Sequence, residues 1–256
     1  GPAFPFEEFE RRAKAAIDSL AASGPAISIT INARAAALAW LNAFLATGQS
    51  EDRPVLYRTL ALEFFEAGVQ FIGCDGTAIF RAFVPRASHE DEPDYKEPEW
   101  PILAEASDRS IIVMDSDSFA IGFMRTLLRA TKDNPFELLH LTSSPIDDGA
   151  ELALGAEFLK ERLTLRSCGQ RIDLELFEDK YPNWRDAKLG LDAAEHVDGL
   201  TIAPRIMAMV GRIKGASAID LEFYGASKHV TFTARGDCEV RGLLIPMRRA
   251  KVEDDS

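Results

Sequence analysis

The sequence is poor in the residues that build disulfides and metal centres. Its three cysteines, Cys74, Cys168 and Cys238, lie far apart and lack C-x-x-C spacing, which argues against a disulfide framework and against a zinc cluster. The four histidines are scattered, and none has H-E-x-x-H spacing. We therefore expect no metal and no cofactor, and the cysteine usage fits a reducing cytoplasm.

Long apolar runs are also missing. No stretch approaches the roughly 20 apolar residues that a membrane-spanning helix needs, and no charged segment followed by an apolar one opens the chain as in a signal peptide. We therefore predict no membrane contact and a cytoplasmic location. The sequence also lacks a nucleophile elbow, a P-loop, a dinucleotide fingerprint and a triad signature. It predicts no catalytic residues and a protein that is not an enzyme.

The charge balance is strongly acidic, with a formal net charge of −12. An acidic chain does not wrap tightly on DNA, because phosphate neutralisation needs clustered Lys and Arg. Contact with DNA would require the basic residues to gather on one face. The distribution of the positive charge therefore matters more than its sum.

What the chain does contain is an internal repeat. Three stretches share the order of an apolar strand, a short polar break and an amphipathic helix; they are 27–47, 110–131 and 199–216. Each is followed by alternating apolar residues typical of hairpin strands. A repeated β-α-β-β unit cannot bury its own apolar face, so the repeats are expected to stack. The pattern predicts an α+β scaffold with helices on one face of antiparallel sheets.

Local signals place the ends of several elements. Asn32 is expected to cap a helix that runs through Ala46, and Pro204 to occupy the first turn of the third helix. An alternating hairpin is expected around Cys168 and Gly169. The run from Asp115 to Asp117 is interpreted as a helix cap in preference to a metal site.

Four segments fall outside the repeats. Residues 3–24 contain an amphipathic helix, with apolar residues at spacings of three and four. Residues 86–107 are rich in proline and acid and read as a surface connector. Residues 146–160 look like an insertion in the second repeat, and 251–256 form a polar tail.

Four motifs, each in order along the chain, resemble the bacterial DNA polymerase III beta subunit, the sliding clamp; they are RPVLYRTLALEF (53–64), GCDGTAIFRAFV (73–84), KYPNWRDA (180–187) and LLIPMR (243–248). The resemblance implies the DNA-clamp fold, with a clamp domain of two repeats over 25–187 and a half-domain over 188–250. The family's first domain, and the first half of its last domain, have no clear counterpart here.

The resemblance also implies a hydrophobic cleft that binds partner peptides. Residues from all three repeats carry over to it: Leu56, Cys74, Gly76, Thr77, Ile79, Pro182, Ala187, Ile245, Pro246, Met247 and Arg248. Small and apolar side chains suit an apolar trough, and an arginine at its rim can bind a peptide carbonyl or carboxylate. The alternative is that these residues are ordinary core at a repeat junction.

In clamps the helices line the hole and face the DNA. The corresponding basic residues here are Arg34, Arg125, Arg129, Lys132, Arg205, Arg212 and Lys214. Spacings of four and three place Arg125, Arg129 and Lys132 on one helical face, and a spacing of seven does so for Arg205 and Arg212. The alternative is a solvated helix face. The chain is therefore expected to touch duplex DNA without sequence preference.

Two functions remain open at this stage. The first is a processivity factor that encircles duplex DNA and tethers a DNA polymerase, with its clamp loader, through short linear motifs. The second is a clamp-fold adapter that binds partner peptides without enclosing DNA. Three repeats are too few for a usual clamp chain. One hypothesis is that the N-terminal helix replaces a missing helix, so that a homo-oligomer, such as a trimer, closes the ring.

Overall fold

The computed structural model describes residues 26–48, 55–87, 100, 107–113, 119–145, 161–177, 180–187, 201–224 and 229–246. Five of the expected features lie wholly or mostly outside this range: the N-terminal helix (3–24), the cap at 115–117, the insertion (146–160), the tail (251–256) and all but a few residues of the connector (86–107).

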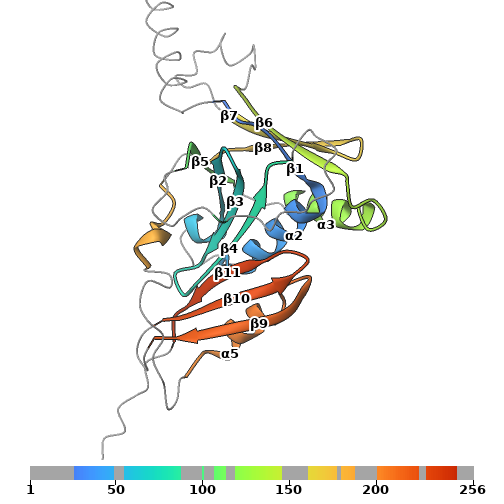
Figure 1. Cartoon of the computed structure of the whole chain (residues 1–256). Helices are drawn as coiled ribbons and strands as arrows, with labels where there is room; N and C mark the ends of the chain where they lie inside the picture. Colours follow the sequence, from blue (N-terminus) through green and yellow to red (C-terminus); the bar gives the residue numbers. More distant parts are fainter. Residues whose placement is uncertain are drawn as a thin grey trace, which may run out of the picture.

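Two antiparallel sheets organise the described part of the chain (Figure 1). The four-stranded sheet has the order β1-β6-β7-β8, with β1 at Ser28–Asn32, β6 at Leu138–Pro145, β7 at Glu161–Ser167 and β8 at Gln170–Glu175. The seven-stranded sheet has the order β5-β2-β3-β4-β11-β10-β9. Its strands are β5 (Arg109–Val113), β2 (Leu60–Phe65), β3 (Gly68–Cys74), β4 (Ala78–Pro85), β11 (Val240–Leu244), β10 (Val230–Gly236) and β9 (Ala216–Phe223).

The first two repeats exchange their opening strands. Strand β1 of the first repeat pairs with β6 of the second, and β5 of the second pairs with β2 of the first. The third repeat is joined through backbone hydrogen bonds, because β11 pairs with β4 from Val240 opposite Ala82 to Leu244 opposite Ala78. The three repeats therefore form one continuous body.

Within the described ranges, three α-helices accompany the sheets: α2 (Ala33–Phe44), α3 (Phe119–Ala130) and α5 (Pro204–Val210). The predicted cap of α2 is confirmed, because the Asn32 side chain accepts a hydrogen bond from the amide of Ala35 at 2.9 Å. Helix α2 lies very close to β3. A Cβ atom at Gly73 would come within 1.9 Å of the Ala43 carbonyl oxygen, so only glycine permits this approach.

The seven-stranded sheet has two different faces. On its inner face, Phe71 packs against Trp40 of α2 with ring centroids 6.0 Å apart, and both side chains are fully buried in the main core. On its outer face, Ala61, Ile72 and Ile79 belong to a second, smaller cluster. Because side chains alternate along a strand, neighbouring residues of β2, β3 and β4 serve the two clusters in turn.

Several sequence predictions are confirmed and three are wrong. The hairpin around Cys168 and Gly169 is present, with both residues at positive φ, and Pro204 lies in the first turn of α5. The third helix, however, ends at Val210 with Gly211 as its C-cap. Residues 201–203, expected as the end of an opening strand, have no strand structure, and helix α2 ends at Phe44, before Ala46.

Candidate functional site

The outer face of the seven-stranded sheet carries a compact apolar group that we call the junction cluster. It combines side chains from all three repeats: Ala61, Ile72, Cys74, Ile79, Trp184 and Leu243. Tyr57 and Tyr181 pack against it and are partly buried. The strands bring these residues together because β3, β4 and β11 are neighbours in the sheet. The short 3-10 helix Trp184–Ala187 supplies the tryptophan.

One edge of the junction cluster is a tight turn between β3 and β4. The Asp75 carboxylate accepts hydrogen bonds from the Thr77 amide at 2.8 Å, the Thr77 hydroxyl at 2.7 Å and the Ala78 amide at 2.9 Å. Gly76 has a φ of +81°, which L-residues with side chains rarely adopt. The sequence signal for this turn was the Asp-Gly pair, since such pairs favour turns.

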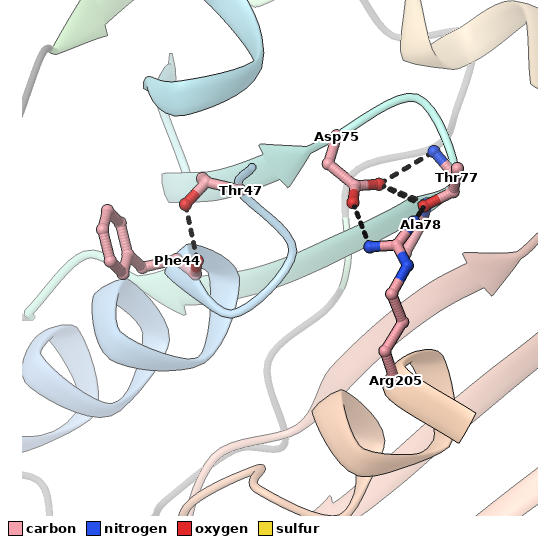
Figure 2. Close-up of polar contacts among 6 residues, drawn as sticks. All are labelled: Phe44, Thr47, Asp75, Thr77, Ala78 and Arg205. Carbon is pink, nitrogen blue, oxygen red and sulfur yellow. Dashed lines mark hydrogen bonds and ion pairs between the residues drawn. The ribbon is translucent and has the colours of Figure 1, made fainter. Parts of the chain in front are cut away.

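The third repeat contacts this turn from two sides. Figure 2 shows Arg205 of α5 reaching the turn: its Nη1 donates to Asp75 at 3.2 Å and its Nη2 to the Thr77 hydroxyl at 2.9 Å. The amide of Ile245 donates to the Thr77 carbonyl oxygen at 2.9 Å. Figure 2 also shows the end of α2, where the Thr47 hydroxyl donates a hydrogen bond to the Phe44 carbonyl oxygen at 2.8 Å. The turn is thus fixed by contacts from α5 and the segment after β11.

The charge state of the turn follows from these contacts. Burial alone would raise the pKa of Asp75, but the hydrogen bonds from Thr77, Ala78 and Arg205 together lower it. Asp75 is therefore ionised at neutral pH, although it is only 2% exposed. The ionised carboxylate holds the Gly76 turn in one conformation.

The junction cluster itself is uncharged. Burial raises the pKa of the Cys74 thiol, so this side chain behaves as a small apolar group. Burial also raises the pKa of Tyr181 well above its usual value. The Tyr181 hydroxyl donates to the Ile72 carbonyl oxygen at 3.2 Å. Apolar side chains with a few fixed polar groups at the edge can bind an apolar ligand with a defined orientation.

The structure gathers part of the predicted cleft. Cys74 and Ile79 lie inside the junction cluster, and Gly76, Thr77 and Ile245 lie at the turn beside it. Leu56 and Pro182 are half-buried, each adjacent in sequence to one of the two tyrosines. Ile245 is 47% exposed and Pro246 half-buried. The backbone of Ala187 ends the 3-10 helix, whereas Met247 and Arg248 lie outside the described residues.

Sequence reasoning missed Tyr57, Tyr181, Trp184 and Leu243. All four lie within the motifs quoted above, at most two positions from a residue that was named. Trp184 carries the clearest signal that could have found it, because a tryptophan close to a proline in a short irregular segment needs an apolar partner to be buried.

The residues expected to face DNA have different surroundings. Arg125 and Arg129 are exposed on α3, and Lys132 is exposed just after it. Arg34 is half-buried: its Nη1 donates to the Leu128 carbonyl oxygen at 3.3 Å, and its Nη2 lies 3.6 Å from Asp237.

The basic residues of the third repeat do not share a helical face. Helix α5 ends at Val210, so Arg212 lies in the turn that follows, and Arg205 is engaged by Asp75. This corrects the predicted face, because the helix ends at its C-cap, Gly211, before Arg212 is reached. Lys214 is exposed, and its backbone amide and carbonyl group bind the buried side chain of Asn42.

A second candidate is an open hollow of about 610 Å³ near the turn between β7 and β8. Phe136, Leu138, His140, Arg166 and Cys168 are among its lining residues, and none of them was predicted to bind a partner. Among the residues that the structure describes, no group of three or more His, Cys, Asp or Glu side chains could hold a metal ion. No helix in the same part of the chain is long and apolar enough to cross a membrane.

Comparison with known proteins identifies the fold. No family model matches the sequence, and no curated protein matches it significantly. The structure is similar to a DNA sliding clamp (DNA polymerase III subunit beta) of Pseudomonas aeruginosa, with a TM-score of 0.55, 9% identity and coverage of 88% of this chain and 67% of that one. It is also similar to the DNA polymerase sliding clamp of Bacillus subtilis, with a TM-score of 0.52, 11% identity and coverage of 88% of this chain and 65% of that one. A third similar structure is the DNA polymerase III subunit beta of Borrelia burgdorferi, with a TM-score of 0.54, 10% identity and coverage of 88% of this chain and 65% of that one.

The predicted fold class is therefore confirmed. The chain has the α+β fold of the bacterial sliding clamps, with antiparallel sheets and helices packed on them. It spans about two thirds of the length of these clamps, since the matched share of their chains is 65% to 67%. At 9% to 11% identity the likeness concerns the fold, and activity and partners need separate arguments.

Proposed function

We propose that this protein is a non-enzymatic, clamp-like processivity factor in the cytoplasm, and that its junction cluster is the docking site for a linear motif of a DNA polymerase or repair protein. The observation that carries the proposal is the convergence of three repeats on one apolar cluster beside a rigid turn. In the sequence, these are the segments whose motifs resemble those of the clamp family.

The chemistry of the cluster supports peptide docking. Ile245, 47% exposed, and the half-buried Tyr57 and Tyr181 offer apolar contact at the edge of the cluster. Leu243 and Ile79, which are buried, support that edge from within the cluster. Gly76 has no side chain of its own, and the Tyr57 ring lies beside it, with its Cζ atom 3.4 Å from where a Cβ atom would be. Affinity would come from two or three apolar anchors, as is usual for short motifs.

The face that would meet DNA is that of α3. Arg125, Arg129 and Lys132 are exposed there, and no salt bridge is found for them among the described residues. Such contacts to phosphates are sequence-independent and weaken with salt, so they permit sliding. A chain of net charge −12 would keep DNA only through this local face or through enclosure.

The assembly that encloses DNA remains part of the proposal. Strand β8 is an edge strand of the four-stranded sheet, and β9 is an edge strand of the seven-stranded sheet. In a homo-oligomeric ring, several copies of this chain would together close the circle around DNA. The hypothesis that the N-terminal helix contributes to closure is tested by deleting residues 3–24 and measuring the mass of the assembly in solution.

One experiment tests the whole proposal. The full chain is loaded on nicked circular DNA, the complex is isolated, and the DNA is then cut once. A ring that encircles DNA stays on the circle and is released after linearisation. If the protein leaves the circular DNA when the salt concentration is raised, and cutting the DNA has no further effect, the result would contradict encirclement.

The second candidate is the adapter, which binds peptides without enclosing DNA. It is favoured by the acidic balance, because a net charge of −12 opposes lasting contact with phosphates. A monomer in solution that binds apolar peptides, yet leaves circular DNA before cutting, would establish the adapter in place of the clamp.

A further inference from the structure

Arginine and tryptophan side chains alternate along the outer face of the seven-stranded sheet. The Cζ atom of Arg241 lies 4.5 Å from the ring centroid of Trp100, and that of Arg81 lies 5.2 Å from the same ring. Arg81 is also 5.5 Å from the Trp184 ring, which Arg185 approaches to 4.3 Å. We call this row, Arg241-Trp100-Arg81-Trp184-Arg185, the arginine–tryptophan stack. At these distances each pair makes a cation–π contact.

Both ends of the stack are neutralised by carboxylates. Arg185 binds Glu63 through two hydrogen bonds of 2.6 Å each, and Arg241 binds Glu239 at 2.6 Å. The oxygens of Glu63 are fully used, because they also accept from the Trp184 ring nitrogen at 3.2 Å and from the Gln70 amide at 3.1 Å. Neither end has a carboxylate to spare for the centre.

Arg81, at the centre, has no such partner. It is 6% exposed, and among the described residues its Nε and Nη1 atoms have no hydrogen-bond partner. Burial, together with the nearby charges of Arg241 and Arg185, lowers the pKa of Arg81 to about 10, and the charge of Glu63 opposes this only in part. The side chain is therefore still charged at neutral pH. A buried charge without a hydrogen-bonded counter-ion is unfavourable, and native proteins rarely keep one without a ligand or a role.

The position of this charge points to the source of the missing anion. Arg81 and Arg241 are directly opposite each other on β4 and β11. Each lies two residues from a member of the junction cluster, Ile79 on one strand and Leu243 on the other, so all four side chains share the outer face. Arg241 is 41% exposed and leaves the stack open to solvent on its side.

We propose that Arg81 and Arg241 form a carboxylate-binding site that recognises an acidic side chain of the peptide docked on the junction cluster. The site rests on the proposed function, because the peptide's apolar residues would place the acid over the stack. A guanidinium group can bind a carboxylate through two parallel hydrogen bonds, and the indole rings hold the guanidinium of Arg81 in place. Nucleic acid is the less suitable ligand, since the stack lies on the sheet face opposite α2.

The test uses the intrinsic fluorescence of the full chain. The protein has three tryptophans; Trp40 is fully buried in the main core, so changes on binding report on Trp100 and Trp184. The first probe is succinate, a small dicarboxylate. The second is a panel of hexapeptides that each contain two leucines and have acetylated N-termini and amidated C-termini. At each of the remaining positions in turn, one peptide carries Asp and its matched partner carries Asn. The variants are Arg81→Met and Arg241→Gln, with Arg171→Met on the exposed strand β8 as the matched control.

The expected result is a saturable signal with succinate in the wild type and in Arg171→Met, which is lost in Arg81→Met. In the peptide panel, Asp at one position should bind about tenfold more tightly than Asn, as one charged hydrogen bond provides, and this ratio should fall to about one in both stack variants. Binding of the Asn peptides should remain, because the apolar anchors are intact.

The outcomes separate the two proposals. If no peptide binds but succinate gives the Arg81-dependent signal, the docking function fails and the carboxylate site stands. If apolar peptides bind with equal Asp and Asn affinities, and succinate gives no saturable signal, the carboxylate site is wrong. Displacement of succinate by an oligonucleotide, and by no peptide, would also overturn it in favour of a phosphate site.

Discussion

Two arginines of this protein are almost equally buried but have opposite surroundings. Arg109, 8% exposed, sits between the two sheets, where its guanidinium binds both carboxylate oxygens of Glu161 and donates to the Ser143 hydroxyl at 3.3 Å. Arg81, 6% exposed, has tryptophan rings beside it and no carboxylate partner.

The difference separates a structural charge from a binding charge. Arg109 of β5 reaches Glu161 of β7, so its ion pair ties the seven-stranded sheet to the four-stranded one. Losing either partner would leave an uncompensated charge in the interior. Arg81 already lacks a hydrogen-bonded carboxylate, and the proposed ligand would supply one. Stability measurements on variants of four arginines test this difference.

The largest effect is expected at Arg109. Arg109→Met should lower the free energy of unfolding by about 3 kcal/mol, because Glu161 then remains buried without its partner. Urea unfolding followed by circular dichroism measures the change. The double variant Arg109→Met, Glu161→Leu should recover most of the loss. A single variant as stable as the wild type would remove the structural role of this pair.

The opposite sign is expected at Arg81. Arg81→Met should raise the free energy of unfolding by about 1–2 kcal/mol at pH 7, since relief of the buried charge outweighs the lost cation–π contacts. With a folded-state pKa near 10, below the ordinary arginine value, the charge destabilises the wild type at neutral pH, and this cost fades as the pH rises through 10. Arg81→Met should therefore lose part of its advantage above pH 10. Destabilisation at pH 7 would mean that the stack is purely structural.

An intermediate effect is expected where the arginine is half exposed. Arg205 is 52% exposed and binds Asp75, whose pKa is lowered. The stabilisation from Asp75 is therefore present above the ordinary aspartate pKa and is lost as the pH falls through the lowered value. Arg205→Met should cost about 1 kcal/mol at pH 7 and make unfolding begin at higher pH in an acid titration. An unchanged acid midpoint would contradict the coupling of α5 to the turn.

The smallest effect is expected at the surface. Arg171 is 50% exposed and pairs with Asp173 at 3.0 Å. Exposed pairs contribute little because water screens them, so Arg171→Ala should change stability by less than about 0.5 kcal/mol. The same urea series measures it. A loss as large as that of Arg109 would contradict the expectation that this exposed ion pair contributes little to stability.

Local features of the fold were predictable because local chemistry decides them. Asn32 has the side chain for a cap, and the residues of the Asp75 turn carry their own hydrogen bonds. The exchange of β1 and β5 between the first two repeats was not predictable, because alternation shows that a strand is half-buried without naming its neighbour. The length of α5 was missed since Gly211 was read as part of the helix.

The candidate site was predictable to the extent that it lies within short motifs. Cys74, Gly76, Thr77 and Ile79 follow one another on a single turn and strand, so one motif found them. The arginine–tryptophan stack is assembled from segments far apart in the chain. Trp100 lies in a stretch without period, and no spacing rule connects it with Arg241.

The pairing of β4 with β11 has a consequence for synthesis. Residues 78–85 leave the ribosome long before residues 240–244, so the backbone groups of β4 that face β11 wait unpaired while the intervening chain is made. An unpaired strand edge with apolar side chains invites pairing with another molecule. Chains that stop before β11 should therefore be captured by chaperones or aggregate, while chains that reach it close the edge within one molecule.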